Sequence, residues 1–122
     1  MKKQFIVKKN LEFNKIINSK KCTKNRYFII YYDNACYNYS RFGISVGKKI
    51  GKAYLRNKYK RKIRMILSTN KKNYSNKYDY IIIMTKECLN LTHVDLEKNL
   101  NILMNKINEE DLKWKKIVKV KY

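Results

Sequence analysis

The chain has no proline, and among its 122 residues it has only three glycines, three cysteines and one histidine. Negative charge is scarce too: nine acidic residues face thirty lysines and arginines, for a formal net charge of +21. Three cysteines at irregular spacing do not suit the paired disulfide framework of a small secreted domain. No cysteine or histidine pair has the short spacing of a zinc site, so the sequence predicts no metal held by the protein.

Long hydrophobic runs are also missing. The longest apolar stretches, 27–32 and 80–84, are far shorter than the ~20 residues that cross a bilayer. The N-terminal MKKQFIVKK lacks the apolar segment of a signal peptide. Hydrophobic residues nevertheless make up 44% of the chain, which is enough for a packed core. We therefore expect one cytoplasmic domain over residues 1–122, with a basic tail at 110–122 whose role stays open.

The excess of positive charge indicates the kind of partner. Charge of this size opposes compaction by self-repulsion, so its presence points to a polyanion. A membrane-surface protein would need an exposed helix with a large apolar face opposite its basic face. The apolar helix faces of this chain are needed to cover a sheet, so we expect nucleic acid and no membrane.

Helical spacing of apolar residues predicts three helices. The first covers 10–19, with Asn10 as its N-cap, and the second covers about 53–68. Thr92 and Asp95 resemble a capping box at the start of the third helix. Apolar residues follow there at helical spacing: Leu96, Leu100, Leu103 and Ile107.

Residues typical of β-strands predict the sheet. Strands are expected at 27–32, at 42–46 with a continuation to Ile50, and at 78–84, which is apolar enough to be buried on both faces. The stretch 112–122 fits either a short strand or a basic amphipathic turn. Helices between and after strands predict an α+β fold, a two-layer α/β sandwich with helices packed on a small sheet.

The second helix contains the most basic part of the chain. Residues 48–64 include nine lysines and arginines and no acid. At 100° per residue, six residues share one side of this helix: Lys52, Arg56, Asn57, Lys60, Arg61 and Arg64. Leu55, Tyr59, Ile63 and Ile66 face away from them. No carboxylate is available to pair with the basic residues, so they repel one another unless an anion binds, and we expect RNA phosphates there.

The run from Arg41 to Arg64, RFGISVGKKIGKAYLRNKYKRKIR, resembles the core of the bacterial ribonuclease P protein subunit. The matching residues include Gly51-Lys-Ala53 and Arg56-Asn57-Lys58, where Lys58 replaces the family's second arginine but keeps the charge. The flanks at 8–17, 25–31 and 78–83 are also similar, so the resemblance covers about residues 8–107. Ile17 and Gly47 depart from the family pattern, which often has an aromatic residue and a serine there.

The resemblance implies a fold in more detail than the residue pattern does. It implies the order α-β-β-β-α-β-α, a small mixed sheet, and a ribosomal-protein-like architecture. It also implies a left-handed crossover between parallel strands, although general rules favour the right-handed form.

The resemblance also implies a function, as an accessory protein to a catalytic RNA. That RNA removes the 5′ leader of precursor tRNA by magnesium-assisted hydrolysis, so the protein supplies no catalytic residue, and Mg2+ is held mainly by the RNA and substrate. One protein per ribonuclease P RNA is expected. The six residues named above would contact the catalytic RNA. A cleft between the first helix and the sheet would bind the single-stranded leader through Phe13, Ile17, Tyr31, Ser45, Lys48 and Lys49.

Two alternatives remain open at this point. A structural RNA-binding protein of ribosomal type has the same charge, size and fold class, and only the run at 51–64 with its flanks argues against it. We favour a cleft position for Phe13 and Tyr31, with a place in the core as the alternative. Tyr54 and Tyr59 are expected to be packing residues.

Overall fold

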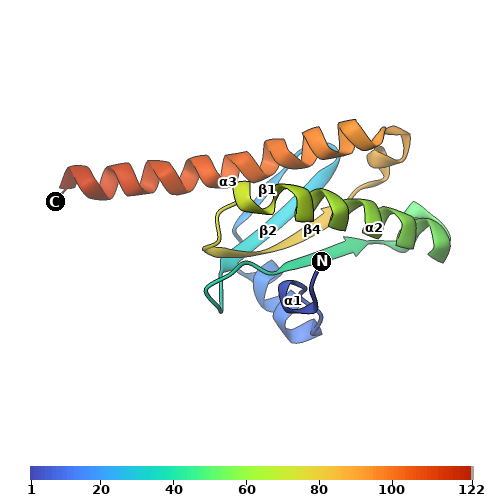
Figure 1. The fold of residues 1–122 in the computed structure, drawn as a ribbon, viewed down its shortest axis with the longest axis horizontal. Helices are drawn as coiled ribbons and strands as arrows, with labels where there is room; N and C mark the ends of the chain where they lie inside the picture. Colours follow the sequence, from blue (N-terminus) through green and yellow to red (C-terminus); the bar gives the residue numbers. More distant parts are fainter. Residues whose placement is uncertain (122) are drawn as a thin grey trace.

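The computed structural model describes the backbone of residues 1–121 and the side chains of residues 1–109 (Figure 1). The helices are α1 (Asn10–Asn18), α2 (Ala53–Asn70) and α3 (His93–Lys121), and the strands are β1 (Cys22–Lys24), β2 (Phe28–Asn34), β3 (Phe42–Val46) and β4 (Tyr78–Met84). Short 3-10 helices are η1 (Lys3–Phe5), η2 (Lys48–Ile50), η3 (Lys71–Asn73) and η4 (Lys86–Asn90). The predicted order α-β-β-β-α-β-α is confirmed.

The four strands form one mixed sheet in the order β1-β2-β4-β3. β2 is antiparallel to β1 and β4, whereas β3 is parallel to β4. α2 connects the two parallel strands, and its position on the near side of the sheet in Figure 1 makes this crossover left-handed. The mixed sheet and the crossover agree with what the family resemblance implies.

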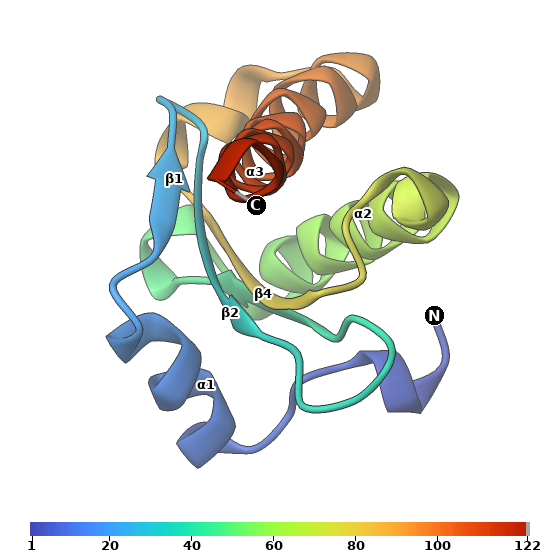
Figure 2. The same ribbon diagram turned by 90° about the vertical axis from the view of Figure 1, so that its left-hand side faces the viewer.

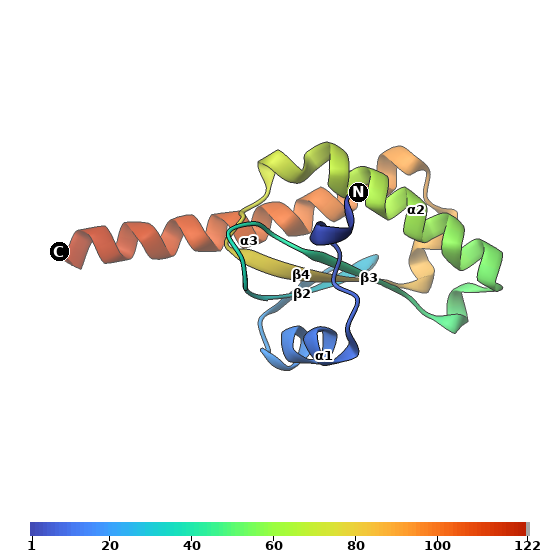
Figure 3. The same ribbon diagram turned by 60° about the horizontal axis from the view of Figure 1, so that its bottom comes forward.

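Helices cover both faces of the sheet. α2 and α3 lie on one face and α1 lies on the other (Figures 2 and 3). The apolar run of β4 serves both sides, since Tyr80 and Ile82 join the large core under α2 and α3, while Ile81 packs with α1. The prediction that this strand is buried on both faces is confirmed.

The strand predicted to continue from 42–46 to Ile50 ends instead at Val46, so this part of the prediction is wrong. After Gly47 the chain turns into η2, where the Ile50 N–H donates to the Gly47 carbonyl at 3.0 Å. Gly51 then adopts φ +146°, a conformation that favours glycine. A Cβ atom at Gly51 would also lie 2.8 Å from Leu55 Cδ2. Glycine at position 51 thus directs the chain into α2.

Three element boundaries differ from the sequence-based prediction. Lys9, not Asn10, is the N-cap of α1, and it makes no side-chain capping bond. The polar stretch 20–25 contains strand β1, which pairs only with β2 at the edge of the sheet and therefore carries no apolar pattern. α3 continues to Lys121, so the strand interpretation of 112–122 is wrong as far as that residue.

The predicted start of α3 is confirmed, because the Asp95 N–H donates to Thr92 Oγ1 at 3.2 Å. In the part of the chain that the structure describes, none of the helices is long and apolar enough to span a membrane.

Candidate nucleic-acid interface

α2 separates its apolar and basic residues onto two faces. Tyr59, Ile63, Ile66 and Leu67 are buried in the large core, and Leu55 packs against it. On the other side, four residues of the predicted RNA-binding set are exposed and two are half-buried: Lys52, Asn57, Arg61 and Arg64, then Arg56 and Lys60. We call these six residues the basic ridge. None of the six is fully buried, so the prediction that they lie outside the core is confirmed; five belong to α2, and Lys52 is its N-cap.

Among the side chains of residues 1–109, no acidic residue pairs with the basic ridge. The ion pairs of the described side chains are Arg26–Glu87, Arg41–Glu12 and Arg41–Asp79, and none of them involves α2. Arg56 Nε is shielded from solvent and has no hydrogen-bond partner among the described atoms. Arginine guanidinium groups can bind two phosphate oxygens at once, and lysines add mobile positive charge. The ridge is thus equipped to bind a polyanionic backbone.

Tyr54 lies on the surface of the protein rather than in its core. It is 71% exposed at the start of α2, so the expectation that it is a packing residue is wrong. Tyr59 is buried as expected, and its ring lies 5.3 Å from Lys62 Nζ. The helical spacing that buries Tyr59 turns Tyr54 away from the core, and this could have been read from the sequence.

The predicted leader-binding residues gather on the opposite face of the sheet. Phe13 and Ile17 of α1 and Tyr31 of β2 are half-buried around a small core of Val7, Ile16 and Ile81. The Phe13 ring lies against the backbone of Gly43, where a Cβ atom would come within 2.6 Å of Phe13 Cε2. We call Phe13, Ile17 and Tyr31 the α1 surface. Its members are neither fully buried nor fully exposed, so they pack in part against the sheet, and their contact with a leader stays a prediction.

The other three predicted leader-binding residues follow this surface along the chain: Ser45 in β3, then Lys48 and Lys49 in η2. In register, Ser45 lies beside Ile83, one row beyond the Gly43–Ile81 pair on which Phe13 packs. Lys48 and Lys49 follow in η2 and are exposed. Because η2 joins β3 to α2, these two lysines lie between the α1 surface and the start of the basic ridge.

Arg41 ties α1 to the sheet, a role that the sequence analysis did not identify. It is only 6% exposed, and its guanidinium donates to Glu12 Oε2 at 2.9 Å and to Asp79 Oδ2 at 3.0 Å. Its backbone N–H donates to Asp79 Oδ1 at 3.0 Å. Burial lowers the pKa of Arg41, but the hydrogen bonds and charges of Asp79 and Glu12 outweigh burial, so the net pKa is raised. This network holds the helix that carries Phe13.

The described side chains do not form a candidate metal site. No group of three histidine, cysteine, aspartate or glutamate side chains that could hold a metal ion occurs among the described residues. Cys22 and Cys36 are exposed, and Cys88 is buried with its thiol directed at the Tyr27 carbonyl, 3.1 Å away.

Known proteins are similar to this chain over most of its length. A family model described as ribonuclease P matches residues 1–108. The ribonuclease P protein component of Mycoplasma mycoides subsp. mycoides SC is 48% identical over 108 residues, which cover 88% of this chain and 99% of that protein. Similarity in sequence thus extends over both the basic ridge and the α1 surface.

Solved structures show the same fold. A Staphylococcus aureus RNase P protein mutant superposes with a TM-score of 0.80 at 32% identity, covering 87% of this chain and 90% of the other. The RNase P protein from Thermotoga maritima superposes with a TM-score of 0.75 at 30% identity, covering 82% of this chain and 96% of the other. The chain therefore belongs to the ribonuclease P protein family.

Proposed function

We propose that this protein is the accessory subunit of ribonuclease P, and that it binds the catalytic RNA and the 5′ leader of precursor tRNA. The observation that carries the proposal is the basic ridge of α2, which is wholly or partly exposed and forms no ion pair with the acidic residues described at positions 1–109, in a member of this family. RNA phosphates supply the missing negative charge, and binding releases their condensed counterions.

The arrangement of the two surfaces allows two RNA segments to bind at once. α2 and α1 lie on opposite faces of the sheet (Figure 3), so RNA on the ridge leaves the α1 surface accessible. On that surface, half-buried aromatic rings offer stacking faces to unpaired bases, and Lys48 and Lys49 follow the backbone. The protein thus holds the leader beside the catalytic RNA.

The protein's part in the reaction is binding and positioning. The reaction is magnesium-dependent endonucleolytic cleavage that yields the mature tRNA 5′ end, and the catalytic RNA carries out the chemistry. Magnesium ions are held mainly by that RNA and the substrate. The protein contributes by neutralising phosphate charge and by fixing the leader, which lowers the entropic cost of reaching the reactive geometry. One protein acts per RNA, in the cytoplasm.

Equilibrium binding tests this proposal against a general structural role in RNA binding. The purified protein is titrated with a bacterial ribonuclease P RNA and with a ribosomal RNA fragment of equal length, at the same salt concentration. Preference for the ribonuclease P RNA supports the proposal. Equal affinity for both RNAs would favour a structural RNA-binding protein of ribosomal type.

A further inference from the structure

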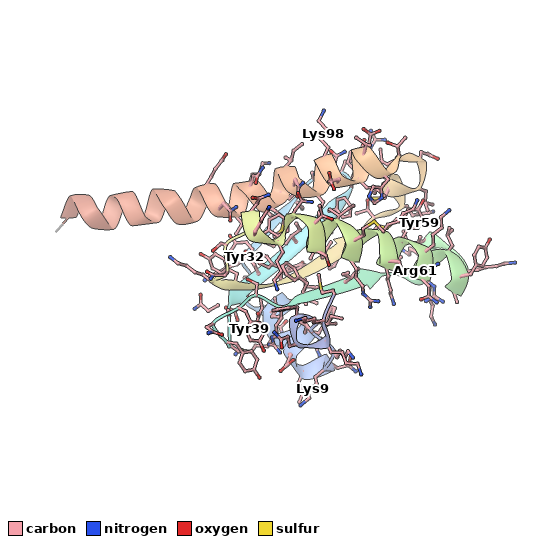
Figure 4. All side chains as sticks on the ribbon, in the orientation of Figure 1. Lys9, Tyr32, Tyr39, Tyr59, Arg61 and Lys98 are labelled. Carbon is pink, nitrogen blue, oxygen red and sulfur yellow. The ribbon has the colours of Figure 1, made fainter. Side chains whose placement is uncertain are left out.

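α2 carries a line of exposed residues on the side opposite its buried face. The buried face consists of Tyr59, Ile63, Ile66 and Leu67. At 100° per residue, four exposed residues spaced i, i+4, i+7 and i+11 lie on the opposite side, and we call them the outer line: Tyr54, Lys58, Arg61 and Met65. In Figure 4, Tyr59 of the buried face and Arg61 of the outer line leave α2 in different directions. The outer line shares Arg61 with the basic ridge.

The outer line places an aromatic ring in solvent at the start of α2. Tyr54 is 71% exposed. Among the side chains of residues 1–109, none makes a ring contact or a hydrogen bond with Tyr54. The start of α2 also lies at the end of the molecule away from the C-terminus (Figure 1). Packing within the described part of the chain therefore does not account for an aromatic ring at this position.

Polar and basic side chains border the Tyr54 ring. Asn57 and Lys58 follow Tyr54 by three and four residues, so their Cβ atoms lie about 5–6 Å from that of Tyr54. Arg61 follows by seven residues, about 10 Å from Tyr54 along the helix axis. All three residues are exposed, and none of the ion pairs described among residues 1–109 involves them. A flat ring thus lies beside two groups that bind phosphate and one amide that both donates and accepts hydrogen bonds.

We propose that Tyr54 stacks on an unpaired base of the catalytic RNA, and that Lys58 and Arg61 bind the phosphates next to that base. This deepens the proposed function and rests on it, because the RNA bound at the basic ridge brings the base to Tyr54. Surface aromatic rings bind unpaired bases by stacking, whereas the bases of a duplex already stack on one another. Tyr54 therefore favours RNA that is unpaired at this point of the ridge.

The surroundings of Tyr54 disfavour two other occupants. An apolar protein surface would leave Lys58 and Arg61 without partners, so the charge favours a polyanion. The 5′ leader is expected at the α1 surface, which lies on the other face of the sheet from α2 (Figure 3). An unpaired nucleotide of the catalytic RNA suits both the ring and the two cations.

Equilibrium binding of a bacterial ribonuclease P RNA to the full chain tests the role of the ring. Tyr54→Ala should weaken binding by about fivefold or more, while the slope of log affinity against log salt stays the same because no charge is removed. Tyr54→Phe keeps the stacking face and should retain most of the affinity. Leu11→Ala is the control, since it removes an 84% exposed side chain from α1 and should leave the affinity unchanged. Unchanged affinity in Tyr54→Ala, or an equal loss in Tyr54→Phe, would overturn stacking.

Ribose acylation of the RNA in these complexes identifies the nucleotide, because the reagent modifies flexible, unpaired positions. At saturating protein, at least one nucleotide that reacts in the free RNA should be protected by the unchanged protein and reactive again with Tyr54→Ala. The same reactivities in both complexes would overturn the proposal.

A variant with Arg56→Ala, Lys60→Ala and Arg64→Ala separates this proposal from the proposed function. Weaker binding in this variant without weaker binding in Tyr54→Ala would overturn stacking by Tyr54 and leave the proposed function standing. Equal affinity of the unchanged protein for ribonuclease P RNA and for a ribosomal RNA fragment of the same length would overturn both.

Discussion

The ring of Phe13 lies directly on Gly43, at a point where the backbone of β3 carries no side chain. A Cβ atom at Gly43 would stand 2.6 Å from Phe13 Cε2 and 2.6 Å from Ile81 Cδ1. Glycine is therefore required at this position for close approach, not for backbone conformation, and it sets the depth at which α1 packs on the sheet.

Gly43→Ala should consequently destabilise the protein by about 1–3 kcal/mol, since an added methyl group in a packed contact forces its neighbours aside. Urea unfolding monitored by circular dichroism measures the decrease in stability. Gly47→Ala is the matched control, because a Cβ atom there has nothing within 4 Å and the backbone φ is −71°. Equal stability of the two variants would show that Phe13 does not sit on Gly43.

Phe13→Ala should leave binding of the catalytic RNA intact while reducing the preference for precursor tRNA over mature tRNA. The reason is that the α1 surface lies on the face of the sheet away from α2, so the ridge is undisturbed. Filter binding with both tRNA forms, in the assembled complex, measures the ratio. Leu11→Ala, at a residue of the same helix that is 84% exposed, should change neither affinity. If Phe13→Ala weakens both tRNA forms equally, Phe13 has only a packing role.

Replacing Arg56, Lys60 and Arg64 together with alanine should weaken binding to ribonuclease P RNA. The slope of log affinity against log salt should fall by ~0.7–0.9 for each phosphate that the variant no longer neutralises. Lys24→Ala, Lys86→Ala and Lys98→Ala form a control of equal charge on exposed residues outside α2. Identical slopes for the two triple variants would mean that the ridge does not bind phosphates.

Asp79→Asn should destabilise the fold by ~3 kcal/mol, because it removes the negative charge from a buried ion pair. Among the described residues, the acidic partner left to Arg41 would then be Glu12, whose side chain is 35% exposed. The free energy of unfolding from urea titration is the readout. Glu87→Gln disrupts the exposed Arg26–Glu87 pair and should have little effect. An unchanged free energy of unfolding in Asp79→Asn would contradict the inference that Arg41 anchors α1 to the sheet.

Thiol reactivity should divide the three cysteines into two classes. Burial raises the pKa of the Cys88 thiol to about 11, with a contribution from Glu87 and against a backbone hydrogen bond from Thr85. At pH 8 a disulfide reagent should modify Cys22 and Cys36 quickly and Cys88 only after unfolding. Rapid modification of all three cysteines in the native protein would contradict the burial of Cys88.

The same raised pKa makes stability depend on pH. A thiol that ionises less readily in the folded state binds its proton more tightly there than in the unfolded chain. The associated stability is present below pH 9, the ordinary pKa of the thiol, and disappears as pH rises towards 11. Between pH 9 and pH 11, the free energy of unfolding should therefore decrease less in Cys88→Ala than in the unchanged protein.

The elements with strong apolar periodicity were predictable from the sequence. β4 was predicted with the bounds that the structure has, and α2 begins where predicted, because each is anchored by a long run of core residues. β1 and the end of β3 could not be predicted in this way. β1 is short, polar and at an edge, and the end of β3 depends on how η2 and Gly51 lead into α2.

The candidate site was predictable to the extent that it lies on one element. The basic ridge follows from helical spacing alone, because its residues are close in sequence. Interactions between distant segments were not predictable: Phe13 with Gly43, Arg41 with Glu12 and Asp79, and Tyr39 with Phe5. The family resemblance named Phe13, but the reason for its half-buried position required the fold.

Reconstituted cleavage of precursor tRNA tests the central claim most directly. The purified protein is combined with a bacterial ribonuclease P RNA at low millimolar magnesium, beside each component alone. The account predicts cleavage at the mature 5′ end when both are present, little with the RNA alone, and none with the protein alone. Tight RNA binding without any gain in cleavage would contradict it.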